Sequence, residues 1–271
     1  MNNIILKKNM NGLITSQKVL KIFLSILFFL SISVFSVFGQ QMNKMKMDAP
    51  YVNNGDMKEM QDQTMLPMPF FTHMGIPYSV GTYGLRFAAL PTINDGKTKT
   101  EFNFQFETGL SKTVGLFIGG EGLFDSTTLE AMFQFLVWKS NNGRNGISPI
   151  IEFEFPLGKD ATRRVYTLVG FASTFSNSNV AFNQVLHYSP IEDLAEGSAS
   201  VLVKVSKRIF LVSEISGVTE KGAQPIFNLL AGVKFQLNKN ILLGLAYQLP
   251  LTTNRDYDSQ FVFQPNLMFQ K

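Results

Sequence analysis

From residue 79 onward, apolar and polar side chains alternate along the chain with a period of two. In the stretch 98–110, Phe102, Phe104 and Phe106 fall on one face of an extended chain, and Glu101, Asn103, Gln105 and Glu107 fall on the other. The stretches 150–157, 225–237 and 260–270 repeat this pattern with Phe, Leu and Ile opposite Glu, Gln, Asn and Lys. Alternation over this length predicts β-strands that have one apolar side and one polar side.

Segments of this kind predict about twelve strands between residues 79 and 271. Their average spacing suits strands of about ten residues joined by turns and loops. The alternation is mixed at 114–124, 164–174 and 179–188. The predicted strands are 79–90, 98–110, 114–124, 128–139, 147–157, 164–174, 179–188, 197–206, 209–218, 225–237, 241–251 and 258–270.

Three connections share one sequence pattern, in which an apolar residue is followed by Ser or Asn, Lys, any residue and another apolar residue. They are LSKTVGL at 110–116, VSKRIFL at 205–211 and LNKNILL at 237–243. Each predicts a tight hairpin turn, and the strand order places all three at the same end. The connections at the other end, including 91–97, 191–197, 219–224 and 253–258, are more variable and mostly charged, so longer loops are expected there. This asymmetry is typical of transmembrane barrels.

The pattern therefore favours an all-β fold, an antiparallel transmembrane β-barrel of about twelve strands over residues 79–271. A soluble sandwich or lipocalin-like barrel is the alternative, with the apolar faces turned inward. Phe-rich faces on nearly every strand would overfill so small an interior. A closed barrel with its apolar side toward lipid satisfies every backbone group and leaves no open sheet edge.

These hairpins, together with a last strand that ends in LMFQK, resemble the outer-membrane β-barrels of diderm bacteria. The resemblance is strongest to small transporter-like barrels linked to phenol-degradation pathways (the MetA-pathway type). It implies residence in the cell outer membrane and a C-terminal aromatic residue that the insertion machinery recognises. Here Gln270 and Lys271 follow Phe269, which departs from that pattern.

The first 39 residues differ in composition from the rest of the chain. Lys7, Lys8, Lys18 and Lys21 precede the uncharged run 22–38, and Gly39 offers a cleavage point, as in a secretory signal peptide. A retained transmembrane anchor is the alternative, because 17 apolar residues reach the lower limit for spanning. Without these four lysines, the 24 basic residues fall to 20, equal to the 20 acidic ones. The basic character thus belongs to the export signal and predicts no nucleic-acid partner.

If the apolar side of the barrel meets lipid, the opposite side lines the lumen. Seven acids against three bases would make the lumen negative and cation-preferring. A buried network of ion pairs that fills a closed barrel is the alternative, since buried charges need partners. The predicted lumen-lining residues are Arg86, Glu101, Glu107, Glu121, Glu130, Glu152, Glu154, Lys204, Glu214 and Lys234.

Residues 40–78 hold eight of the twelve methionines in a polar, proline-containing stretch that cannot bury enough apolar surface to fold alone. Thioethers select Cu(I), and by the same softness Ag(I), so this stretch is a candidate soft-metal arm. The alternative is a periplasmic linker or a plug whose methionines pack adaptably. The candidate ligands are Met42, Met45, Met47, Met57, Met60, Met65, Met68, His73 and Met74.

No catalytic constellation stands out, so no enzyme activity is expected. The chain has no Cys, which excludes disulfides, thiolate metal sites and a Cys nucleophile. His187 with Ser189 and Asp193 could imitate a triad, but such proximity in sequence arises easily by chance. The sequence thus predicts a monomeric outer-membrane barrel for passage or binding of small solutes or cations, with lipid as its surroundings. If the Met-rich arm binds metal, a periplasmic metal-handling partner is expected. The alternative function is a non-conducting structural or adhesion barrel that acts through its outer loops.

Overall fold

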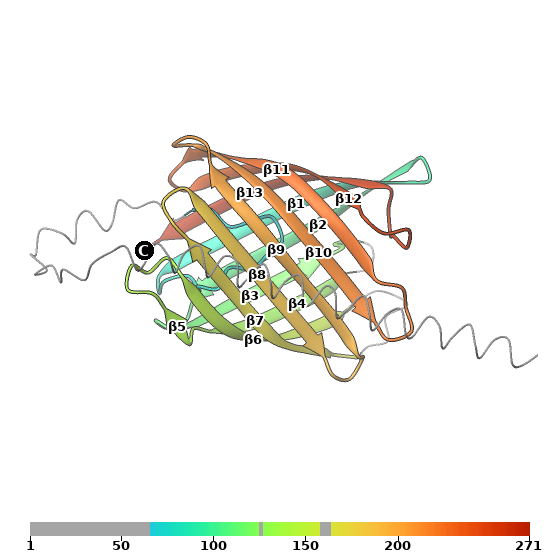
Figure 1. Ribbon diagram of the computed structural model, residues 1–271, viewed down its shortest axis with the longest axis horizontal. Helices are drawn as coiled ribbons and strands as arrows, with labels where there is room; N and C mark the ends of the chain where they lie inside the picture. Colours follow the sequence, from blue (N-terminus) through green and yellow to red (C-terminus); the bar gives the residue numbers. More distant parts are fainter. Residues whose placement is uncertain (1–65, 125–126, 158–163) are drawn as a thin grey trace, which may run out of the picture.

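Twelve long strands form one closed antiparallel barrel in the computed structural model (Figure 1), which describes residues 66–124, 127–157 and 164–271. A short strand, β5, lies beside β6. The strands are β1 (Thr82–Asn94), β2 (Lys97–Gly109), β3 (Val114–Glu121), β4 (Thr128–Phe135), β5 (Trp138–Lys139), β6 (Gly146–Pro156), β7 (Tyr166–Ser176), β8 (Val180–Ser189), β9 (Leu194–Lys204), β10 (Ile209–Glu220), β11 (Ile226–Asn238), β12 (Ile241–Pro250) and β13 (Ser259–Gln270).

Each long strand pairs with its neighbours in sequence, and two further pairings complete the ring. β1 pairs antiparallel with β13, from Thr82 opposite Gln270 to Ile93 opposite Ser259. β4 pairs with β6 across the connection that contains β5. No long strand is left with an open edge, which is how a sheet satisfies its backbone in lipid. The predicted fold class, an antiparallel transmembrane barrel of about twelve strands, is confirmed.

Most strand boundaries differ from the prediction by one to three residues, and two strands differ in extent more clearly. The expected strand 128–139 is divided, because Leu136 and Val137 leave the β4 ladder and donate their amides to the carbonyls of Thr113 and Ile147. The expected strand 79–90 begins only at Thr82 and continues to Asn94. Residues 66–81 instead form an irregular segment that leads into the barrel wall.

The connections also differ from the expected asymmetry. The end of the barrel that carries the β2–β3, β9–β10 and β11–β12 hairpins is called the turn end here, and the opposite end is the loop end. The turn end also holds the longer β4–β6 connection, whereas β1 and β2 at the loop end are joined by Asp95 and Gly96 alone. Both residues have positive φ, 49° and 72°. Asp-Gly favours this two-residue turn, whose twist matches that of the strands.

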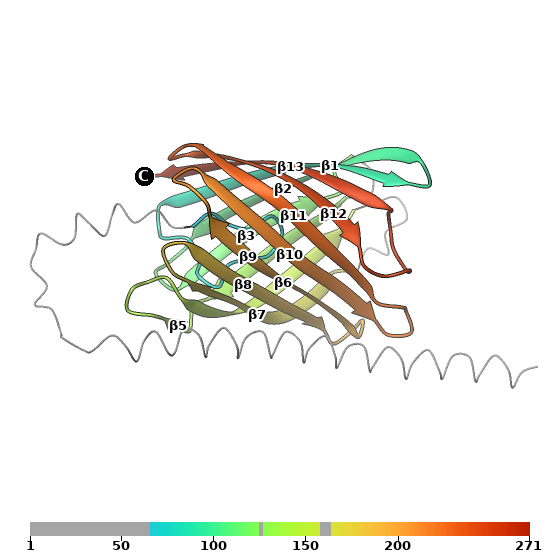
Figure 2. The same ribbon diagram turned by 45° about the horizontal axis from the view of Figure 1, so that its top comes forward.

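The outward face of the wall is apolar along most strands. On β13, outward Phe261 and Phe263 are about half exposed, whereas inward Val262 and Gln264 are buried. The same alternation recurs on β1, β10 and β12 (Figure 2 shows the wall from a second side). An apolar belt around a closed barrel is the surface that a bilayer requires. The described part of the chain contains no helix long and apolar enough to cross a membrane.

If the outward apolar face meets lipid, the free-energy cost of a charged substitution on it should depend on its depth in the membrane. Phe263 lies in the middle of β13 and faces outward, with its side chain 45% exposed. A Phe263→Arg substitution should cost about 2–4 kcal/mol of folding free energy in a bilayer, because it moves a charge to mid-membrane depth. Leu251→Arg, directly after the loop end of β12, is the control and should cost about 0–1 kcal/mol. Equal costs in a bilayer unfolding titration would show that this face does not meet lipid.

Candidate functional site in the barrel lumen

Residues 66–79, called the luminal segment here, run inside the barrel in its turn-end half. The segment is coloured cyan before β1 and lies within the ring of strands in both ribbon views (Figure 2). Phe70 and Thr72 are completely buried, and Met74 and Ile76 nearly so. The segment has no regular secondary structure, so its backbone groups need partners from the wall.

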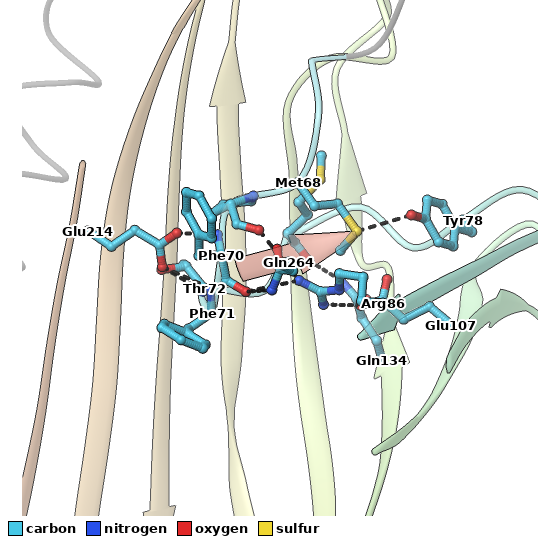
Figure 3. A network of polar contacts seen from close by, with 12 residues as sticks. Met68, Phe70, Phe71, Thr72, Tyr78, Arg86, Glu107, Gln134, Glu214 and Gln264 are labelled. Atoms are coloured by element: carbon cyan, nitrogen blue, oxygen red, sulfur yellow. Dashed lines mark hydrogen bonds and ion pairs between the residues drawn. The ribbon is translucent and has the colours of Figure 1, made fainter. Parts of the chain in front are cut away.

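Glu214 on β10 binds the first part of this segment (Figure 3). Its carboxylate accepts hydrogen bonds from the backbone amides of Phe70, Phe71 and Thr72, the last two at 3.0 Å, and from the Thr72 hydroxyl at 3.1 Å. The Glu214 side chain is 3% exposed. Successive amides that converge on one carboxylate form an anion-binding turn. The Glu214 carboxylate therefore holds the backbone of the segment in place at residues 70–72.

Lys234 on β11 binds the same part of the segment through carbonyl groups. Its ammonium donates to the carbonyls of Met68 and Pro69, both at 2.7 Å, and to Oε1 of Gln264 at 2.9 Å. The ammonium also lies 4.4 Å from the centroid of the Phe70 ring, in a cation–π contact. Lys234 is completely buried, and its three donors have three acceptors.

Arg86 on β1 and Gln264 on β13 complete this network. Arg86 makes an ion pair of 2.6 Å with Glu107 on β2 and longer contacts of 3.4–3.5 Å with the carbonyls of Phe70 and Pro69. The Gln264 amide donates to the Phe70 carbonyl at 2.8 Å. Figure 3 shows Arg86 and Gln264, from the neighbouring strands β1 and β13, reaching the segment on the side away from Glu214. Buried charges are therefore paired with each other or with backbone, as buried charges must be.

The second part of the luminal segment is held by neutral side chains of β4, β6 and β7. The amide of Gly75 donates to the Thr174 hydroxyl at 2.7 Å, and its carbonyl accepts from the Ser148 hydroxyl at 2.8 Å. The Gln134 amide donates to the Met74 carbonyl at 2.7 Å. The segment thus spans the lumen from β10 and β11 on one side to β4, β6 and β7 on the other.

Inward glycines of the wall make room for the segment. A Cβ added at Gly232 or Gly244 would lie 2.7 or 2.6 Å from the Phe70 ring, and one at Gly115 would lie 2.6 Å from Pro77. Such distances are shorter than any real Cβ contact, so a larger residue would displace the segment. The inner surface of the wall is therefore shaped to fit residues 70–77.

The lumen beside the segment is partly apolar. Phe70 packs in a buried cluster with inward residues of the wall, among them Leu202, Phe210, Leu230 and Val262. A second inward cluster contains Phe117, Met132 and Ile150. Together with the polar contacts, these clusters fill the turn-end half of the barrel with protein.

The loop-end half of the lumen carries an acidic cluster, which comprises Glu121, Glu130, Glu152, Glu154 and Glu196. Glu130 on β4 lies directly opposite Glu154 on β6. His187 on β8 approaches Glu152 at 3.1 Å and Glu196 at 3.6 Å through Nδ1. Like charges opposite each other on neighbouring strands repel. The negative charges are therefore concentrated above the segment, whereas Arg86 and Lys234 are used to hold it.

Comparisons with solved structures identify the architecture. The NanC porin superposes with a TM-score of 0.51 at 6% sequence identity, over 70% of this chain and 99% of that chain. The KdgM porin superposes with a TM-score of 0.52 at 8% identity, over 69% and 99% of the two chains. The KdgM porin in complex with disordered oligogalacturonate gives 0.50 at 8% identity, over 70% and 99%.

The fold is that of a porin-type outer-membrane barrel. No family model matches the sequence. No curated protein matches it in a sequence search. At such low identity the likeness to porins concerns the fold, and the lumen of this porin-like barrel has to be interpreted from its own residues.

The ten residues predicted to line the lumen all occupy inward positions of this porin-like barrel, but they have different surroundings. Arg86, Glu107, Glu214 and Lys234 belong to the network around the luminal segment, whereas Glu121, Glu130, Glu152 and Glu154 belong to the acidic cluster. Glu101 pairs with Lys99 at 3.1 Å near the loop end. Lys204 lies at the turn end of β9 and is half-buried.

The sequence prediction did not include several luminal residues. Gln134, Ser148, Thr174 and Gln264 were missed because neutral side chains carry no charge signal. His187 and Glu196 could have been found from the β8–β9 hairpin, where they are directly opposite. The suspected triad is not assembled, since the Ser189 hydroxyl donates to Glu192 and Asp193 accepts from the Tyr188 hydroxyl.

Only part of the predicted soft-metal arm falls in the described residues. Met68, His73 and Met74 belong to the luminal segment, and the Tyr78 hydroxyl donates to Sδ of Met68 at 3.1 Å. In residues 66–124, 127–157 and 164–271, no group of three His, Cys, Asp or Glu side chains could hold a metal ion. The predicted signal peptide and the remaining candidate ligands, Met42, Met45, Met47, Met57, Met60 and Met65, lie outside the described residues.

Proposed function

We propose that this protein is an outer-membrane channel for small solutes, with a preference for cations, and that its lumen is closed by the luminal segment and opens when that segment leaves. The chain would be exported by its N-terminal signal and surrounded by outer-membrane lipid. A closer relationship to the barrels linked to phenol-degradation pathways remains a prediction.

The observation that carries this proposal is how the segment is bound. It crosses the turn-end half of the lumen, yet side chains hold it through about ten hydrogen bonds and no strand of the wall includes it. Its departure would break no ladder of the barrel. The vacated walls would present Arg86, Glu107, Glu214 and Lys234 to water, and these polar groups suit a solvated passage.

The acidic cluster supports the preference for cations. Five carboxylates face the loop-end half of the lumen, and His187 lies against two of them. Arg86 and Lys234 are already bound to the segment, to Glu107 or to Gln264. Charge of one sign inside a low-dielectric wall concentrates ions of the opposite sign. A cationic solute that enters from the loop end would thus meet an attractive field before it reaches the closure.

The second candidate function is a structural barrel that conducts nothing. It is favoured by the close fit between Phe70 and the glycines at 232 and 244, which suits a permanent filling as well as a removable one. The two functions differ in conductance. A channel passes current in its open state, whereas a structural barrel passes none in any state.

A reversal-potential measurement under a KCl gradient tests the proposal. The wild-type protein should pass small currents with cation preference, and the double variant Glu130→Gln/Glu154→Gln should shift the permeability ratio toward one. Asp95→Asn, which removes an exposed charge in the β1–β2 turn, is the control and should leave the ratio unchanged. Anion preference in the wild type, or no current in any variant including those that release the segment, would contradict the proposal.

A further inference from the structure

A small cavity lies between the luminal segment and the wall formed by β2, β3 and β4. Its volume is about 20 Å³, which is room for one water molecule or one ion. Its lining includes Met68, His73 and Met74 of the segment and Met132 of β4. Beyond Met74 the chain carries only two further methionines, Met132 and Met268, and one of them faces this cavity.

Four of the side chains that line this cavity, Met68, His73, Met74 and Met132, are soft or borderline metal ligands. Met132 is 2% exposed and Met74 is 8% exposed, so their thioethers are shielded from bulk water. The His73 ring meets the Phe117 ring edge to face, with centroids 4.7 Å apart, and this contact orients the imidazole. Among the described residues, no hydrogen bond engages either ring nitrogen of His73. His73 is half-buried, and its imidazole lies beside three thioethers, so its nitrogens are open to a ligand in this cavity.

The remaining polar groups of the lining do not suit a hard cation. Glu107 is engaged by Arg86 at 2.6 Å. The Tyr78 hydroxyl donates to Met68, which leaves the second lone pair of that sulfur available. Thioether and imidazole donors without free carboxylates select Cu(I) and chemically similar ions over Mg²⁺ or Ca²⁺.

We propose that this cavity is a binding site for one soft monovalent metal ion, Cu(I) or Ag(I), with Met68, His73, Met74 and Met132 as its ligands. Three of these ligands belong to the luminal segment and one belongs to the wall. A bound ion therefore ties the segment to β4, in addition to the hydrogen bonds that already hold it.

The site has a consequence for opening, which rests on the proposed function. A ligand that binds only the closed state shifts the equilibrium toward that state by a factor of about 1 + [L]/Kd, where [L] is the free metal concentration. A free metal concentration of about 100 times Kd should therefore shift the opening equilibrium about 100-fold toward closure. Binding itself does not depend on conductance, and the two can be tested separately.

The test is an Ag(I) titration of the full-length chain folded in detergent, by isothermal calorimetry against a competing ligand of known affinity. Met132→Leu changes little volume and should leave the barrel folded. Removing a residue that only hydrogen-bonds to a metal ligand lowers metal affinity by about 10–100-fold. Removing the Met132 thioether, which is itself a ligand, should therefore weaken Ag(I) binding at one site by at least about tenfold. Met74→Leu should weaken the same site. The control is Met268→Leu, since Met268 is exposed on β13 and does not line the cavity.

X-ray absorption on the Cu(I)-loaded protein gives a second readout. The wild type should show sulfur and nitrogen scatterers around the metal, and Met132→Leu should lose one sulfur. Equal Ag(I) affinity and stoichiometry in the wild type and Met132→Leu, or an unchanged metal environment, would overturn the proposal. If the metal binds as expected and no variant conducts, the site stands and only the channel function fails.

Discussion

Glu214→Gln should open the lumen. The carboxylate of Glu214 receives four hydrogen bonds from residues 70–72. A bond to a charged acceptor is worth roughly 1 kcal/mol more than one to a neutral acceptor, so neutralising Glu214 should weaken the closed state by about 4 kcal/mol. At 1.4 kcal/mol per tenfold, the equilibrium between closed and open states should shift up to about a thousandfold. The measurement is the open probability in planar bilayers at neutral pH.

Glu220→Gln is the matched control for this experiment. Glu220 belongs to the same strand, is exposed at the loop end and makes no contact with residues 66–79 in the described structure. Both variants should show the same heat-dependent electrophoretic mobility as the wild type, which reports the folded barrel. An open probability that is the same in the two variants would mean that the carboxylate of Glu214 does not hold the closure.

Lys234→Met should open the lumen through the opposite set of backbone groups. Without the ammonium, the Met68 carbonyl loses its donor, and the Pro69 carbonyl keeps only the 3.5 Å contact with Arg86. A buried carbonyl without a partner costs about 1–3 kcal/mol, so the closed state should be weakened by at least about that much. Lys239→Met, in the exposed β11–β12 turn, is the control and should leave the open probability unchanged.

The double variant Glu214→Gln/Lys234→Met tests whether the two side chains act on one closure. They bind adjacent residues of the segment, so the loss of one should already loosen the contacts of the other. Residues within one network show coupling of about 0.5–3 kcal/mol, and we expect the double variant to open less than the sum of the two free-energy changes. Strict additivity would indicate that the two residues hold independent parts of the segment.

The strands could be predicted because alternation is a local property of the sequence. Phe102, Phe104 and Phe106 face outward in β2 as predicted, and even the mixed segments near 166–176 and 180–189 form strands. The two-residue turn at Asp95-Gly96 could also have been predicted, because the dipeptide favours positive φ at both positions. Its charged neighbours had suggested a longer loop instead.

A plug was one alternative for residues 40–78, but its path and contacts could not be predicted, because they depend on residues that lie far apart in the sequence. Residues 66–79 have no periodicity, and Lys234 reaches Met68 across 166 positions of the chain. One signal was available in the strands. Gly232 and Gly244 fall on inward positions, and glycine inside a strand marks the close approach of another group.

Deleting residues 66–77 and recording single-channel conductance in a planar bilayer shows whether residues 66–79 close an otherwise continuous passage. A deletion of equal length at residues 44–55 is the control, and both proteins must fold as barrels. We expect the first deletion to produce large, steady, cation-preferring openings and the control to remain as closed as the wild type. A folded barrel that stays closed without residues 66–77 would show that this segment does not close the passage.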